Sequence, residues 1–283
     1  MVVESLLFTK SAEKSPWIML FVGFLYSSVA IFLSLWIFRD EASLVMVFLT
    51  VLASIPLTHK AMQLEESKDL VIEDEGLLLK EHNKAIAFFL FMFLGITLSS
   101  VFWYSVLPAP TINNLFEKQT STIQAINNNI SGNSSQQLTL FNKIFFNNTK
   151  VLVFSLIFAF IYSTGAMFIL TWNATVIGTA IGNFIRANLS TYTLSLGFAN
   201  FGDYLHIISL GILKYSIHGI PEIISYFYGG LAGGILSAAI IKGHLNTPKA
   251  NHILVDFFEL LLISLGFLLV AGFLEVYITP IFF

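Results

Sequence analysis

Six apolar runs, most of them about as long as a bilayer is thick, constrain the fold of this chain more than any other feature. A helix needs about 20 apolar residues to cross roughly 30 Å of hydrocarbon. In lipid the backbone must satisfy its own hydrogen bonds, and a helix does so within one segment. The pattern therefore predicts an all-α, polytopic transmembrane helix bundle. The runs are Trp17–Phe38, Leu44–Leu57, Ala85–Leu107, Val151–Trp172, Ile220–Ile241 and Ile253–Tyr277.

The composition agrees with a membrane environment. Of the 283 residues, 56% are hydrophobic and 11% are charged, whereas soluble domains carry about 25% charged residues. The net charge of -3 and the lack of a basic stripe give no indication of a nucleic-acid partner. Because the chain has no cysteine, disulfides, thiolate nucleophiles and cysteine metal ligands are excluded. The lipid bilayer is the partner that this composition implies.

The first apolar run is a stronger candidate for a membrane span than the second. The first follows Lys10 and Lys14 as a signal peptide would, but it is too long for a signal core and has no cleavage site after it. We therefore expect an uncleaved anchor. The second run is short and ends at Pro56.

Residues 174–216 decide between six and seven spans, because Arg186 and Asp203 interrupt an otherwise apolar sequence. We expect a short helix near 174–186 and a polar-interrupted helix near 198–216. They would form one crossing plus a surface piece, or a re-entrant hairpin. A broken or re-entrant helix is tolerated at membrane depth where protein or water satisfies the backbone.

Lysine and arginine predict the orientation, since they are enriched in cytoplasmic loops. The segment 59–84 carries four lysines, so it and the N-terminus are predicted to be cytoplasmic. If 174–216 crosses once, nine of the fourteen lysines and arginines, including Arg186, are cytoplasmic. Seven spans in the cell membrane, with an external C-terminus, are therefore favoured over six.

The chain divides into three regions. Residues 1–107 form an N-terminal three-span region with the charged loop 59–84, residues 108–150 an extracytoplasmic segment, and residues 151–283 a membrane core. The loop has seven acidic residues, which indicate a solvated helical face or a docking surface for a cytoplasmic partner.

The extracytoplasmic segment is polar but has apolar residues at helical spacing. They predict amphipathic helices from Ile112 to Ile130 and from Leu138 to Phe145 in an outer loop. Candidate glycosylation sequons begin at Asn129, Asn133 and Asn147.

His218 and Glu222 are the main chemical candidates. They lie four residues apart and therefore on one helical face. We expect a helix to start near His218, with Pro221 in its first turn, where a missing N–H is not needed. The pair serves either as structural hydrogen-bonding groups or as the lining of a polar pathway for a proton, an ion or a polar ligand.

Asp203 and His206, three residues apart, complete the ionisable candidates. Their spacing does not resemble a zinc-protease motif, and the sequence contains neither a phosphate-binding glycine loop nor a nucleophile elbow. No metal site and no cofactor are expected, and an intramembrane hydrolase has no support.

Glycines at four-residue spacing predict close helix packing, within the chain or in a homo-oligomer, because small residues let membrane helices approach each other. These glycines are Gly178, Gly182, Gly229, Gly230, Gly233 and Gly234.

Two stretches together resemble the stage II sporulation protein M family of integral membrane proteins, over roughly residues 145–275. In the first, the pair Asn147-Asn148 opens a span that Asn173 closes. In the second, His218-Gly219 and Glu222 precede a glycine-rich helix. The resemblance implies a membrane scaffold that organises partner proteins without catalysis of its own.

The leading interpretation is therefore a non-enzymatic assembly component with membrane-protein partners or a homo-oligomeric state. In it, Asn147, Asn173, His218 and Glu222 form a polar network that fixes broken helices. The alternative is a transporter or channel subunit in which His218 and Glu222 line a polar pathway, since broken helices near polar residues are typical of transporters.

Overall fold

The computed structural model describes residues 15–72, 74–130, 137–161, 164–196, 201–248 and 250–282. Among these residues there is no β-strand, and seven helices are long and apolar enough to cross a membrane. The long helices are α2 (Trp17–Ile37), α3 (Ala42–Asp69), α4 (Glu75–Val106), α7 (Gln137–Ile161), α8 (Ala166–Leu196), α9 (Phe201–Ile241) and α10 (Ala250–Phe273). The short ones are η1 (Arg39–Glu41), α5 (Ala109–Leu115), α6 (Glu117–Ile130), η2 (His244–Asn246), the π-helical turn η3 (Leu274–Ile278) and α11 (Thr279–Phe282). The protein is thus an all-α polytopic membrane bundle, as predicted, and has seven candidate spans.

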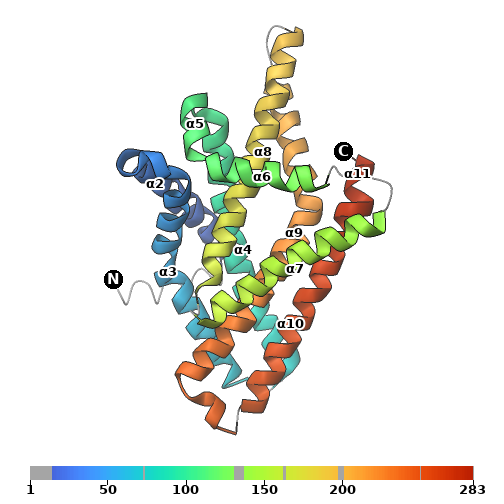
Figure 1. Cartoon of the computed structure of the whole chain (residues 1–283). Helices are drawn as coiled ribbons and strands as arrows, with labels where there is room; N and C mark the ends of the chain where they lie inside the picture. Colours follow the sequence, from blue (N-terminus) through green and yellow to red (C-terminus); the bar gives the residue numbers. More distant parts are fainter. Residues whose placement is uncertain are drawn as a thin grey trace.

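The long helices run back and forth between two ends of the bundle (Figure 1). We call the end that carries α5, α6 and α11 the α5 end, and the end that carries the α3–α4 connection and η2 the η2 end. Helices α8 and α9 project beyond the other helices at the α5 end, and α7 crosses the bundle obliquely (Figure 1).

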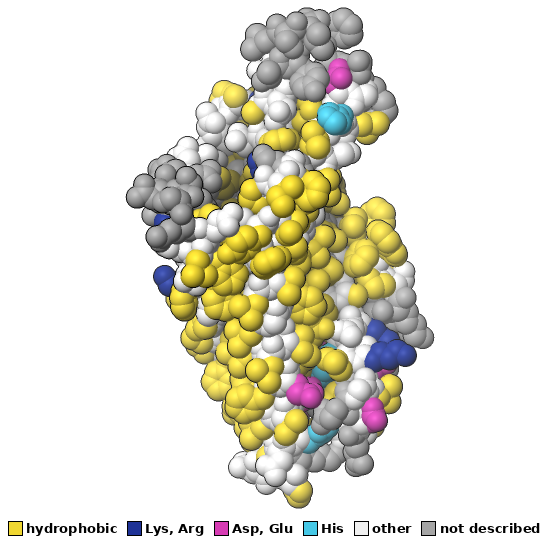
Figure 2. Space-filling view, turned by 90° about the vertical axis from the view of Figure 1, so that its right-hand side faces the viewer, with side chains coloured by type: hydrophobic (Ala, Val, Ile, Leu, Met, Phe, Trp, Pro, Cys, Tyr) yellow, Lys and Arg dark blue, Asp and Glu magenta, His cyan; other side chains and the backbone are white. Residues whose placement is uncertain are grey.

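Helices α4 and α9 form the centre of the bundle. In their most apolar windows, 67% of α4 and 83% of α9 is buried, against 28% for both α7 and α10. The outer helices therefore present apolar side chains to lipid. Figure 2 shows a broad hydrophobic surface across the middle of one face, with most of the charged and histidine side chains above or below it.

Glycines allow the closest helix contacts. A Cβ atom on Gly178 would lie 2.5 Å from the Ser100 Cβ, and one on Gly233 would lie 2.6 Å from the Leu156 carbonyl oxygen. The predicted glycine positions thus pack helices inside one chain: Gly178 and Gly182 face α4, Gly229 and Gly233 face α7, Gly230 faces Ala166 of α8, and Gly234 is buried.

The fourth predicted span, Val151–Trp172, is wrong. Helix α7 ends at Ile161 and α8 begins at Ala166. Between them lies a turn in which the Thr164 carbonyl accepts a hydrogen bond from the Met167 amide at 3.0 Å. Because apolar residues continue on both sides of this turn, the hydropathy pattern joined the end of one span to the start of the next.

The predicted loop 59–84 is also wrong, because most of it is helical. Helix α3 continues through Pro56 to Asp69, and α4 begins at Glu75. Glu65 and Glu66 are fully buried, so the expected solvated face does not include them. They are buried because other helices supply charged partners, which are described below.

The predicted broken or re-entrant region near 174–216 is absent from the described residues. Residues 174–196 continue α8, and residues 201–216 belong to α9. The backbone need not break, because the polar side chains of α8 find carbonyl partners. Arg186 donates to the carbonyls of Tyr104 and Leu107, at 3.1 and 2.8 Å, where α4 ends.

Two further helix boundaries differ from expectation. Helix α9 runs through His218 and Pro221 instead of starting there. Proline removes one backbone donor, but membrane helices tolerate the loss where neighbouring groups compensate. The segment Leu138–Phe145 is the first part of α7 and not a separate amphipathic helix.

Candidate functional site

His218 and Glu222 lie where α7, α9 and the end of α10 meet. The Tyr226 hydroxyl donates a hydrogen bond to Glu222 Oε1 at 2.8 Å, and the side chain of Asn148 in α7 also bonds Glu222. His218 Nδ1 lies 3.2 Å from the Thr279 hydroxyl oxygen. Glu222 of α9 thus reaches α7 through Asn148, and His218 of α9 reaches α11 through Thr279. We call this group the His218 cluster, and it comprises Asn148, His218, Glu222, Tyr226, Glu275 and Thr279.

Helical spacing places three members of the cluster on α9. His218, Glu222 and Tyr226 follow each other at four-residue intervals and therefore stack along one face. Tyr226 is fully buried, so its hydroxyl needs the carboxylate of Glu222 as an acceptor. The cluster therefore belongs to the buried packing around α9 and not to the exposed surface of the bundle.

The π-helical turn η3 positions two further members, Glu275 within it and Thr279 directly after it. Thr279 donates to the Leu274 carbonyl at 3.1 Å across this turn, and its hydroxyl oxygen also meets His218. Glu275, in the same turn, is close enough for its charge to act on Glu222 and Tyr226. Single π-helical turns are rare and are frequent at functional sites.

The cluster offers hydrogen-bonding and acidic groups but no arrangement for metal binding. Among the described residues, no group of three or more histidines or acids could hold a metal ion. Its chemistry is therefore hydrogen bonding between helices, together with two carboxyl groups, Glu222 and Glu275, that act on each other electrostatically.

Other predicted site residues lie elsewhere. Asn147 is exposed and donates to Asn148 at 3.4 Å, so it borders the cluster. Asn173 donates to the Ile169 carbonyl within α8 at 2.8 Å. Asp203 and His206 lie in the projecting first turns of α9. His206 is exposed and about 18 Å along the helix axis from His218. The structure therefore does not bring Asn173, Asp203 or His206 into the cluster.

The predicted glycosylation sequons are not all described. Asn133 lies outside the described residues, and Asn129 lies within α6. Asn147 lies inside the long helix α7, a candidate membrane span. Because glycosylation acceptors lie in surface loops, this position argues against modification of Asn147.

Sequence reasoning missed Tyr226, Glu275 and Thr279. Tyr226 could have been found, because it continues the four-residue spacing of His218 and Glu222. Glu275 carried a weaker signal as an acid near the end of an apolar run. Nothing in the sequence marks the π-helical turn that brings Glu275 and Thr279 to α9.

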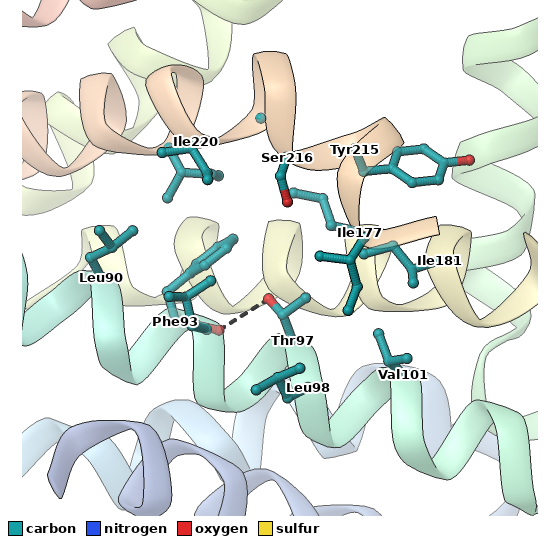
Figure 3. A pocket seen from close by; sticks show the side chains of 14 residues that line it. Leu90, Phe93, Thr97, Leu98, Val101, Ile177, Ile181, Tyr215, Ser216 and Ile220 are labelled. Carbon is teal, nitrogen blue, oxygen red and sulfur yellow. Dashed lines mark hydrogen bonds between the residues drawn. The ribbon is translucent and has the colours of Figure 1, made fainter. Parts of the chain in front are cut away.

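An apolar cavity of about 80 Å³ lies on another face of the same part of α9. Figure 3 shows Phe93, Thr97 and Val101 of α4 opposite Ser216 and Ile220 of α9. The Thr97 hydroxyl already donates to the Phe93 carbonyl at 3.0 Å. Neither His218 nor Glu222 is among the residues that line this cavity, so the cavity does not connect the cluster to a polar pathway.

A second polar group lies at the η2 end, and we call it the His82 network. His82 of α4 is fully buried, with Nδ1 2.9 Å from Glu65 Oε2 in α3 and Nε2 3.3 Å from Asp256 Oδ2 in α10. Beside it, buried Glu66 contacts Lys242 and lies 2.7 Å from His244 Nδ1. The network therefore joins α3, α4, α10 and the α9–α10 connection.

The family comparison agrees with this architecture. A family model described as stage II sporulation protein M matches residues 85–280, from α4 to α11. This range is longer than the predicted resemblance over 145–275, because it includes α4, the helix against which Gly178 and Gly182 pack. No curated protein and no solved structure matches the chain. Because the matched residues make up more than half of its length, the chain belongs to the stage II sporulation protein M family.

Proposed function

We propose that the protein is a membrane scaffold that organises partner proteins in the cell membrane without catalysis of its own. The observation that carries this proposal is the bonding of the His218 cluster. Its polar side chains already have partners: Glu222 bonds Tyr226 of its own helix and Asn148 of α7, and His218 meets Thr279 of α11. Side chains that are bonded in this way fix the arrangement of the helices. They are then less able to take part in catalysis.

Hydrogen bonds between membrane helices are individually modest. They contribute about 0.6 to 2 kcal/mol each, so several of them are needed to select one arrangement. The cluster has two such contacts, Asn148 of α7 to Glu222 and His218 to Thr279 of α11, and the Tyr226–Glu222 bond within α9 adds to them. A fixed arrangement is what a scaffold needs in order to present one surface to its partners.

The orientation is part of the proposal. With seven spans, the two termini lie on opposite sides, and we place the N-terminus and the η2 end in the cytoplasm. Arg186 alters the predicted charge count, because it bonds Leu107 at the α5 end. Moving this residue to the outer side lowers the cytoplasmic count from nine to eight of fourteen lysines and arginines, and the bias remains inward.

The test is co-purification of the full chain in mild detergent, followed by native mass measurement of the complex. The wild-type chain should carry partner proteins or further copies of itself. Glu222→Gln should reduce that assembly, with exposed Glu259→Gln in α10 as the matched control. A chain that purifies alone under these conditions, with the assembly unaffected by Glu222→Gln, contradicts the scaffold.

A transporter or channel subunit is the second candidate, and the juxtaposition of Glu222 and Glu275 favours it. Two acidic groups within membrane-spanning helices are typical of ion and proton pathways. The same variant separates the two functions. In a transporter, Glu222→Gln should fold and assemble normally but lose flux in proteoliposomes, whereas in a scaffold it should weaken assembly.

A further inference from the structure

The His82 network contains a histidine that is held between two acids from two other helices. The His82 side chain has 0% exposure, that of Glu65 0% and that of Asp256 3%. Both ring nitrogens face carboxylate oxygens: Nδ1 is hydrogen-bonded at 2.9 Å on the α3 side, and Nε2 lies at an ion-pair distance of 3.3 Å, without a hydrogen bond, on the α10 side. A neutral imidazole has one N–H, and only the imidazolium ion has a donor on each nitrogen.

The charges around His82 also favour the imidazolium ion. Among the described side chains of the network, four carboxylates meet three lysines, and two of these carboxylates lie against the His82 ring. The carboxylates are Glu65, Glu66, Glu81 and Asp256, and the lysines are Lys68, Lys84 and Lys242. His244 lies at the edge of the network, with 26% side-chain exposure and its Nδ1 2.7 Å from Glu66 Oε1.

We propose that His82 is a proton-dependent clamp that holds α3 and α10 together at the η2 end. In its protonated state it bridges Glu65 and Asp256. When the proton leaves, Asp256 loses this counter-charge, whereas Glu65 keeps Lys68 Nζ 2.6 Å from its Oε1. An uncompensated buried charge is strongly destabilising. The clamp therefore makes the stability of this end depend on pH.

The sign of the dependence follows from the geometry. The folded protein stabilises the charged form of His82 by both bridges, whereas the unfolded chain does not. The contribution is therefore complete at acidic pH and is lost as the pH rises. The expected result for the purified full chain in detergent is a melting temperature that falls by about 5 °C between roughly pH 5 and pH 9.

The experiment compares variants in a His244→Gln background, because His244 is a second histidine in contact with a carboxylate of the network. Introducing His82→Gln should lower the melting temperature at acidic pH and make the melting temperature less dependent on pH. His206→Gln, which changes an exposed histidine of α9, is the matched control and should leave the profile unchanged.

A second variant keeps the test decisive if His82→Gln fails to fold. In Asp256→Asn, a neutral His82 can satisfy Glu65 with its one N–H, so the protein should fold and be less sensitive to rising pH than its parent. Unchanged pH profiles in either variant, relative to the His244→Gln parent, would overturn the clamp. So would a parent whose melting temperature does not fall as the pH rises.

Discussion

Gly23 of α2 and Gly95 of α4 each face the backbone of the other helix at a close approach between the two. A Cβ atom on Gly23 would lie 2.2 Å from the Met92 carbonyl oxygen, and one on Gly95 would lie 2.1 Å from the Leu20 carbonyl oxygen. These oxygens belong to the backbone, so a side chain cannot be accommodated by a change of rotamer. The pair fixes the position of α2 against the centre of the bundle.

Replacing Gly95 with alanine should therefore separate α2 from α4. Overpacking a tight contact costs about 1–3 kcal/mol and occasionally more, which exceeds the gain of up to about 1 kcal/mol from a better helix former. We expect a lower melting temperature of the purified protein in detergent. Gly266→Ala in α10 is the control, because a Cβ atom there meets nothing within 4 Å. Equal stability of the two variants would show that the α2–α4 contact is looser than described.

Tyr226→Phe should destabilise the protein by removing one hydroxyl from the His218 cluster. The lost hydrogen bond goes to a carboxyl group, and such a bond is worth about 0.5–1.5 kcal/mol with a neutral acceptor and about 1.5–3 kcal/mol with a charged one. Thermal unfolding in detergent measures the loss. Tyr26→Phe in α2 is a suitable control because Tyr26 is only partly buried. If both variants melt alike, the Tyr226–Glu222 bond does not contribute to stability.

Glu66→Gln should loosen the α9–α10 connection. Glu66 is buried and contacts both Lys242 and His244, which flank the turn at Gly243. An amide in its place keeps the volume but removes the negative charge that contacts Lys242 and His244. Limited proteolysis after Lys242 should become faster, whereas Glu117→Gln at an exposed pair in α6 should have no effect on it. Unchanged proteolysis would show that other contacts hold this turn.

The sequence predicted the helix class and the glycine-rich face of α9 because both depend on local pattern. Lipid requires each span to be an apolar helix, and small residues at four-residue spacing predict close packing. The His82 network was not predicted, because its members come from helices far apart in the chain. In the sequence, Glu65 and Glu66 belong to a charged segment, and only packing against α4 and the α9–α10 connection explains their burial.

The errors in span boundaries have a related cause. Hydropathy reports whether a residue tolerates lipid, but it does not report where the chain turns. The turn at Thr164 lies within an apolar run, and Pro56 lies inside a helix that continues for thirteen more residues to Asp69. Likewise, Gly23 and Gly95 are isolated glycines in their own helices, so their proximity appears only when α2 and α4 pack.

The proposed orientation gives a further prediction, because the chain has no cysteine and each introduced cysteine is a unique target for labelling. Lys80 is exposed near the η2 end, and Lys118 and Ile281 are exposed at the α5 end. In intact cells, a membrane-impermeant maleimide should label Lys118→Cys and Ile281→Cys, but label Lys80→Cys only after permeabilisation. Labelling of Lys80→Cys alone would reverse the orientation. Labelling of Lys80→Cys and Lys118→Cys from the same side would contradict a crossing by α4, which separates them.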